Sequence, residues 1–214
     1  MTQQHLITFG DSWPEGAELD LPREQTFGAI LATKHGFDRF TNYGKSGTSV
    51  ENMLYQLQDY LAKDHHSSAH VTAIFFLTNP GRTEQWPNLP MHVTNADEMY
   101  KQAMIHFFSD KNQKLRINAS VSALQLWCRN YNISDWYFAG WNRYENWMLG
   151  IDQAKIYKQG QETAADWFGA TKHNGDHLLD VGDNVYIRPN FCHPNQLGHQ
   201  LIADKLWDWI GPSR

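Results

Sequence analysis

Ser12 has the setting of a nucleophile. The apolar run 5–9 ends at Gly10-Asp11-Ser12, a pattern typical of a strand that enters a turn. A serine hydroxyl is a weak nucleophile until a base accepts its proton, and such a corner can point the hydroxyl outward beside backbone N–H groups. We expect Asp11 to contact a bound substrate, although a GDS tripeptide alone is more typical of a turn or helix cap.

His193 is the candidate base. It lies in NFCHPNQLGH, directly before the last predicted helix, where Pro194 and Asn195 suit a helix start. A rigid corner of this kind would hold the imidazole in a fixed position, although a single histidine is more often structural. His199, further along the helix, is expected to be structural or on the surface.

Two further segments could stabilise developing negative charge. The loop 42–49 (NYGKSGTS) offers small residues and free backbone N–H groups, and Asn79 follows the buried apolar run 71–77. Such donors can hold an oxyanion, and removing one costs on the order of 3 kcal/mol. The loop lacks the GxxxxGK[ST] spacing of a phosphate-binding loop. Asn79 alone, directly before Pro80, would more often form a turn.

Alternating strands and helices must position these residues. The predicted strands are 5–9, 39–43, 71–77 and 135–139, and the predicted helices are 26–35, 50–61, 97–108, 115–131 and 195–210, with a long loop over 82–95. This alternation favours a parallel sheet covered by helices on both sides. Ligands bind beyond the carboxyl ends of such strands, so Ser12, the 42–49 loop and Asn79 should meet at one edge.

Length and composition indicate one α/β domain spanning 1–214. The formal charge of −5 and the lack of a basic stripe argue against a nucleic-acid binder. We expect no signal peptide in the first residues, and no stretch approaches the roughly 18 apolar residues of a membrane helix. With only two cysteines, we expect a reducing compartment and a cytoplasmic protein that does not bind membranes.

An aromatic-rich segment, 136–189, is predicted to be an insertion or cap. Aromatic residues make up 14% of the sequence, and many lie in this part of the chain. They could form a wall that faces a ligand, for example by stacking on a sugar, or they could simply fill the core.

Together these segments resemble the SGNH (GDSL-type) hydrolase family. The Ser block is FGDSWPEG (9–16), the Gly block NYGKSGTS (42–49), the Asn block FLTNPGR (76–82) and the His block CHPNQLGHQLIADKL (192–206). The resemblance implies a flavodoxin-like, three-layer α/β/α fold. It also implies hydrolysis of an ester, such as an acyl or acetyl group on a carbohydrate or lipid, without a metal or cofactor.

The resemblance also assigns roles to residues. Ser12 would attack the carbonyl and His193 would accept its proton. The backbone N–H groups of Ser12 and Gly47 and the side-chain amide of Asn79 would form the oxyanion hole. The substrate would be a small-molecule or glycan ester, and the oligomeric state does not follow from the sequence.

The sequence departs from the family pattern at the acid behind the base. The family usually has an aspartate three residues before the histidine, and here that residue is Asn190. The enzyme could then work as a Ser–His dyad, with His193 oriented by Asn190 or a backbone carbonyl. Another acid could substitute, with Asp183 as the nearest upstream candidate, or the site could be degraded.

A second departure lies in the Asn block. The family often has Gly-x-Asn-Asp where this chain has Leu77-Thr78-Asn79-Pro80. Arg82 could bind an anionic group of the substrate, although an exposed pair with Glu84 is the simpler interpretation. The loop Arg-x-Glu-x-Trp at 82–86 also gives a weak resemblance to members encoded by bacteriophages.

Three competing interpretations remain open. The segment 173–180 (HNGDHLLD) has residue types that bind divalent ions, although Asn174-Gly175 interrupts a helix there. Cys192 adjoins His193, but neighbouring side chains usually point apart, and Cys128 is typical of a core residue. Asn190 favours a third interpretation, a non-catalytic binding or structural protein, such as a viral one, on a decayed hydrolase fold.

Overall fold

A parallel four-stranded sheet forms the centre of the molecule. In the computed structural model, the residues described are 3–65, 69–78, 110–140, 143–144, 150–169, 171–172, 179–180, 185–187 and 193–211. The strands are β1 (Gln4–Phe9), β2 (Arg39–Asn42), β3 (His70–Leu77) and β4 (Ile133–Ala139), in the order β2-β1-β3-β4. All three pairings are parallel, so the carboxyl ends of the strands meet at one edge of the sheet.

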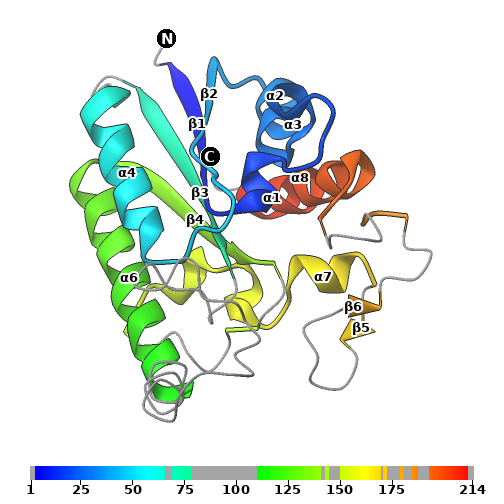
Figure 1. Ribbon diagram of the computed structural model, residues 1–214. Coiled ribbons are helices and arrows are strands. Elements are labelled where there is room, and N and C mark those ends of the chain that lie inside the picture. Colours follow the sequence, from blue (N-terminus) through cyan, green and yellow to red (C-terminus); the bar gives the residue numbers. More distant parts are fainter. Residues whose placement is uncertain are drawn as a thin grey trace.

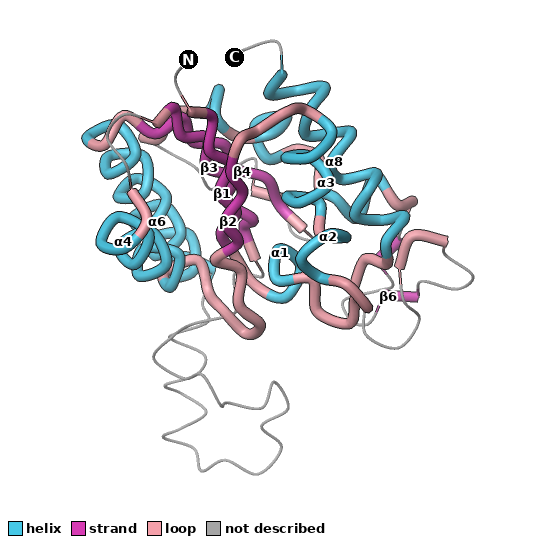
Figure 2. The backbone as a smooth tube through the Cα atoms, turned by 90° about the horizontal axis from the view of Figure 1, so that it is seen from above, coloured by secondary structure: helices cyan, strands magenta, loops and turns pink. Residues whose placement is uncertain are grey.

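Helices cover both faces of the sheet, as Figures 1 and 2 show. One face carries α4 (Asn52–Lys63) and α6 (Asp110–Asn130), and the other carries α3 (Phe27–Lys34) and α8 (Gln196–Ile210). The smaller elements are α1 (Ser12–Glu15), α2 (Pro22–Gln25), η1 (Gln153–Lys155), η2 (Tyr157–Gly160), α7 (Ala164–Trp167) and the antiparallel pair β5 (Thr171–Lys172) and β6 (Leu179–Asp180). The predicted three-layer α/β/α architecture is confirmed.

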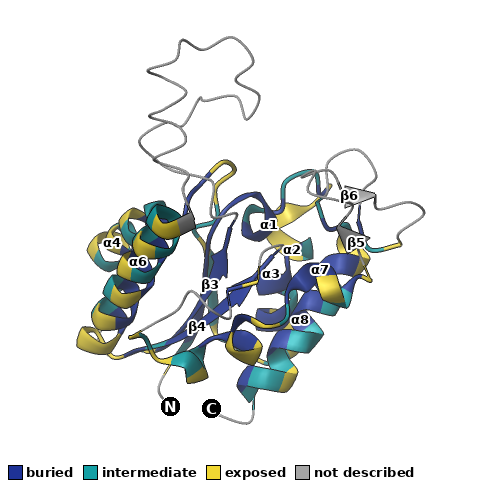
Figure 3. Cartoon of the chain, turned by 90° about the horizontal axis from the view of Figure 1, so that it is seen from below, coloured by how far each residue is buried: buried dark blue, intermediate teal, exposed yellow. Residues whose placement is uncertain are grey.

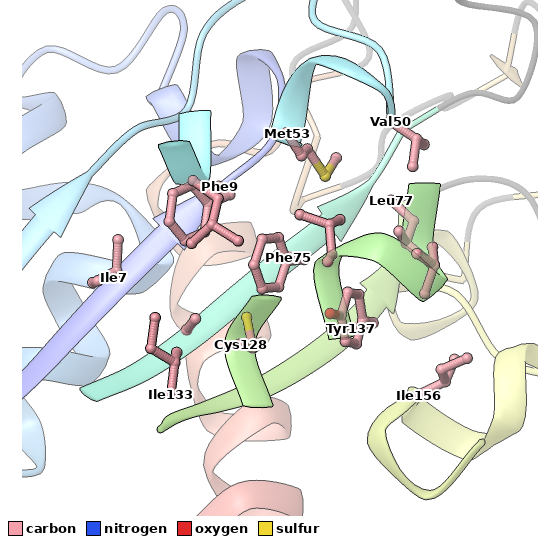
Figure 4. Close-up of a cluster of buried hydrophobic side chains, with 14 of the residues drawn as sticks. Ile7, Phe9, Val50, Met53, Phe75, Leu77, Cys128, Ile133, Tyr137 and Ile156 are labelled. Carbon is pink, nitrogen blue, oxygen red and sulfur yellow. The ribbon is translucent and has the colours of Figure 1, made fainter. Parts of the chain in front are cut away.

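The sheet separates two hydrophobic clusters because successive strand residues point to opposite faces. On β1, Ile7 and Phe9 point toward α4 and α6, where Phe75 and Tyr137 join them (Figure 4). Leu6 belongs to the cluster on the other face. Figure 3 shows β3, β4 and the inward faces of the helices as buried, and β1 is buried along almost its whole length, whereas the edge strand β2 is only partly buried. This two-sided burial explains the nearly continuous apolar strands.

Cys128 lies in the first of these clusters. Its side chain is fully buried on α6, and burial raises the pKa of the thiol, so it stays protonated. The sequence-based interpretation of Cys128 as a core residue is confirmed.

Aromatic side chains between 136 and 169 contribute to the core. Trp136, Tyr137, Phe138, Tyr157 and Phe168 are all buried. For these five residues the core interpretation holds, and a ligand-facing wall does not.

The predicted strands and helices that fall on described residues agree with the structure within a few residues. Helix α6 begins at Asp110, before the predicted start at 115. The predicted helix 97–108 and the predicted loop 82–95 lie outside the described residues.

His199 joins α8 to α3. Its ring is almost fully buried, and Nδ1 accepts a hydrogen bond from the backbone N–H of Phe27 at 3.1 Å. The ring also stacks on the Phe27 side chain. Burial, with a smaller contribution from His193, lowers the pKa of His199 from 6.5 to about 3. His199 is therefore a neutral structural residue, one of the two alternatives expected from the sequence.

This shift predicts a loss of stability in mild acid. Between pH 6.5 and 3 the unfolded chain binds a proton at His199 that the folded chain does not, so stability falls as the pH falls. From pH 7 to pH 5 the expected loss is about 2 kcal/mol. Urea unfolding at both pH values should show this drop in the wild type and a correspondingly smaller one in His199→Asn. Equal drops in the two proteins would contradict the assignment.

Candidate active site

Ser12 lies where β1 turns into the short helix α1. Asp11 caps this helix, because its side chain accepts a hydrogen bond from the backbone N–H of Trp13 at 3.1 Å. The other carboxylate oxygen accepts a bond from the hydroxyl of Thr78 at the end of β3. Ser12 is therefore fixed from two strands, at the carboxyl edge of the sheet.

Asp11 has the capping position that a GDS tripeptide typically has. Its side chain is only 4% exposed, and both carboxylate oxygens accept hydrogen bonds from the protein. A carboxylate held in this way positions the turn and, through it, Ser12. The contact of Asp11 with a substrate stays a prediction.

Gln56 of α4 secures the same turn from the other side. Its side-chain amide accepts a hydrogen bond from the N–H of Gly10 and donates one to the Gly10 carbonyl, both at 3.0 Å. No sequence pattern indicated this role of Gln56, because a glutamine on an amphipathic helix is usually on the surface. The paired bonds satisfy the buried backbone groups of Gly10 where the β ladder ends.

His193 lies beside Ser12. The imidazole Nε2 is 2.9 Å from the Ser12 hydroxyl oxygen, although the two residues are separated by almost the whole chain. Asn195, two residues later, caps α8 by accepting a bond from the N–H of Gly198 at 3.0 Å. Its side chain also donates to the carbonyl of Val185 at 2.8 Å. These bonds fix the chain directly after His193, as the predicted helix start requires.

Glu18 lies on the opposite side of the imidazole. Its Oε1 is 3.2 Å from His193 Nδ1, which is an ion-pair distance, although the angle is not that of a hydrogen bond. The sequence analysis did not predict Glu18, because the acids it considered all lie in the segment shortly before His193. The available signal was the cluster of acidic residues that directly follows Ser12. The predicted third members, Asn190 and Asp183, lie outside the described residues.

The loop after β2 packs against the Ser12 helix. Ser46 donates to the Glu15 carboxylate from its backbone N–H, at 2.7 Å, and also from its hydroxyl. The N–H of Lys45 donates to the carbonyl of Gly10 at 3.0 Å. A Cβ on Gly44 would lie 2.4 Å from the backbone nitrogen of Glu15, so only glycine allows this approach. Gly47, the predicted oxyanion donor, is exposed in the same turn.

The chain between β3 and Asn79 is held by hydrogen bonds at Thr78. Thr78 is buried, and its carbonyl accepts a hydrogen bond from the hydroxyl of Tyr144, which is itself fully buried. Asn79 and Arg82, the other predicted site residues of this block, lie outside the described residues. The described geometry therefore fixes the point from which the chain continues to Asn79.

The segment 173–180, a metal site in one of the competing interpretations, lies mostly outside the described residues. His173, His177 and Cys192 all lie outside them. Among the residues that the structure does describe, no group of three or more His, Cys, Asp or Glu side chains could hold a metal ion. The same residues include no helix long and apolar enough to cross a membrane.

Solved structures of other proteins share this fold along nearly the whole chain, whereas no family model and no curated sequence matches it. TesA superposes with a TM-score of 0.58 at 13% identity, over 98% of this chain and 99% of TesA. The psychrotrophic esterase EstA from Pseudoalteromonas sp. gives 0.51 at 16% identity, over 97% of each chain. The acetyl xylan esterase AlAXEase gives 0.51 at 15% identity, over 95% of this chain and 98% of its own. At these identities the likeness shows a shared fold.

Proposed function

We propose that this chain, which has the fold of the SGNH (GDSL-type) hydrolases, is a serine hydrolase that cleaves a carboxylic ester. The observation that carries the proposal is the 2.9 Å distance between His193 Nε2 and the hydroxyl of Ser12. A hydroxyl at hydrogen-bond distance from an imidazole can lose its proton as it attacks a carbonyl. The four sequence blocks and the esterases among the similar structures support the same chemistry.

The reaction proceeds in two steps on Ser12. The hydroxyl oxygen attacks the ester carbonyl while His193 takes its proton, and His193 then gives that proton to the departing alcohol. A water molecule attacks the acyl-enzyme, with His193 again as the base, and the acid product and Ser12 are released. Apart from this water, the scheme uses only side chains and backbone of the protein.

The oxyanion is assigned to three donors. Ser12 is the first residue of α1, where backbone N–H groups are not used by the helix itself. The N–H of Gly47 and the amide of Asn79 complete the set by resemblance to the family. The substrate that we propose is an acyl or acetyl ester of a carbohydrate or lipid, since one of the similar structures is an acetyl xylan esterase.

A fluorophosphonate probe tests the proposal, because it reacts covalently only with an activated serine. We expect one adduct per native chain, located by peptide mass spectrometry on the peptide that contains Ser12. Heat-denatured protein, in which His193 and Ser12 are apart, is the control and should stay unlabelled. Native protein that stays unlabelled would overturn the hydrolase proposal. It would favour instead the non-catalytic binding protein that Asn190 first suggested.

A further inference from the structure

We infer that Glu18 is the positioning residue that orients His193 and stabilises its protonated form. In the family, an aspartate three residues before the histidine has this role. This chain has Asn190 at that position. The inference rests on the proposed function, since it concerns the base of that reaction. It moves the acid from the segment before His193 to the turn that directly follows the Ser block.

The geometry forms a continuous line of three side chains. His193 lies between Ser12, 2.9 Å from Nε2, and Glu18, 3.2 Å from Nδ1. If Nε2 accepts the serine proton, the neutral ring must carry its own proton on Nδ1, which faces Glu18. A carboxylate at this point favours the required tautomer and the positive charge that forms during attack. Catalytic hydrogen bonds are often poorly aligned before substrate binds, which accounts for the imperfect angle.

Other carboxylates near Ser12 have different partners. Asp11 binds Trp13 and Thr78, and Glu15 binds Ser46. Glu18 is the carboxylate of this segment that is placed within ion-pair distance of the imidazole. Its side chain is 25% exposed and that of His193 is 21% exposed, so water only partly screens the pair.

The second carboxylate oxygen of Glu18 is a reason for this residue to interact with a charged imidazole. Oε2 is buried and has no hydrogen-bond partner among the described residues. A buried carboxylate oxygen without a donor is unfavourable, and a nearby positive charge compensates for it. An imidazolium at His193 provides that charge during the reaction. The placement therefore lets Glu18 stabilise the positive charge that forms on His193 while Ser12 attacks the ester.

The backbone at Glu18 also differs from that of an ordinary surface residue. Its φ of 68° lies in the left-handed region, which is uncommon for a residue other than glycine or asparagine. The turn is fixed on both sides, since Ala17 N–H donates to the carbonyl of Ser12, and Leu19 N–H donates to that of Gly16. Such conformations are concentrated at functional sites. Here the turn directs Glu18 back toward the helix from which Ser12 comes.

The test compares Glu18→Gln and Glu18→Asp with the wild type and with Glu24→Gln. Gln is nearly the same size as Glu but has no charge, and Glu24 is an exposed carboxylate on α2 that serves as the matched control. The readouts are turnover of p-nitrophenyl acetate from pH 5 to 9 and the rate of fluorophosphonate labelling. Circular dichroism verifies the fold of each variant. The titratable neighbour His199 is unchanged in all four proteins.

Glu18→Gln should lower turnover by at least about 100-fold, since loss of the corresponding charge in another triad cost about 10⁴-fold. The acid limb of kcat/KM should move to lower pH, because His193 loses a neighbouring negative charge. Glu18→Asp keeps the charge but moves it away from Nδ1. Its turnover should fall less, by about tenfold, with the acid limb close to that of the wild type. Glu24→Gln should match the wild type.

The outcomes separate the two proposals. An active, labelled wild type together with a folded Glu18→Gln that keeps wild-type turnover and acid limb would overturn the role of Glu18 alone. An inactive, unlabelled wild type would overturn the hydrolase proposal itself. If Glu18→Gln does not fold, Glu18→Asp decides the matter. Wild-type turnover in Glu18→Asp contradicts the inference, and a loss of turnover with an unmoved acid limb supports it.

Discussion

Replacement of Ser12 with alanine should lower turnover of an activated ester by at least about 10⁴-fold, the scale seen when a catalytic serine is removed. The variant lacks the oxygen that forms the acyl-enzyme, so only water could attack the ester. The oxyanion donors, which are backbone and amide groups in this assignment, stay in place and leave a small residual rate. KM should change much less than kcat, because the hydroxyl contributes mainly to bond formation.

Stability should be almost unaffected by the same change. Ser12 lies at the first position of α1, and the helix is capped by Asp11, which the substitution does not touch. Loss of the contact with His193 should alter the free energy of unfolding by about 1 kcal/mol at most. Kinetics, fluorophosphonate labelling and urea unfolding of one preparation check the three expectations together. Ser122→Ala, an exposed serine on α6, is the matched control and should keep full activity. If Ser12→Ala kept more than about one hundredth of wild-type turnover, the nucleophile would lie elsewhere.

The sheet and the Ser12–His193 pair could be predicted from the sequence for one physical reason. Strands that are buried on both faces must be apolar throughout, so runs such as 71–77 identify β3 directly. In a parallel sheet all carboxyl ends lie at one edge. Polar residues that follow different strands must then meet there, whatever their separation along the chain. The start of α8 places His193 at the same edge.

The role of Glu18 could not be predicted in this way. Its contact with His193 depends on a turn in which a glutamate adopts a left-handed conformation. Residue type disfavours this conformation, so no local pattern indicates it. Asp11 shows a related limit, because its type suits both substrate binding and helix capping. The contacts of Asp11 in the folded chain show the capping role, which its type alone does not.

The start of α6 could not be predicted either. The first turn of the helix, 110–114, is DKNQK, which contains no apolar residue and therefore no periodicity. Helix α6 contributes buried side chains to the core only from Ile117 onward. Polar first turns extend a helix beyond the face that packs, so the sequence pattern gave a start that is too late.

Gly10→Ala should be the most destabilising substitution at the junction of sheet and active site. The φ of Gly10 is 138°, where a residue with a Cβ is strained by about 1–3 kcal/mol. An added Cβ would lie 2.9 Å from the Cβ of Phe76 and from the Cγ of Pro14, and 3.0 Å from the Phe76 carbonyl oxygen. Overpacking of this kind costs a further 1–3 kcal/mol or so. The free energy of unfolding should therefore fall by about 2–6 kcal/mol, measured by urea unfolding.

Gly36→Ala separates the cost of a positive φ from the cost of a crowded Cβ. Gly36 also has a positive φ, of 68°, but a Cβ there would have nothing within 4 Å. The Gly36→Ala variant should lose only about 1 kcal/mol of the free energy of unfolding, from the backbone conformation, and keep full activity. In Gly10→Ala the strand end must move away from Phe76, which shifts the carbonyl and N–H that Gln56 holds. Turnover of the folded fraction should therefore fall as well, because Ser12 moves relative to His193. Equal stability of the two variants would mean that β3 yields to the added methyl group and that contact with Phe76 does not fix the turn.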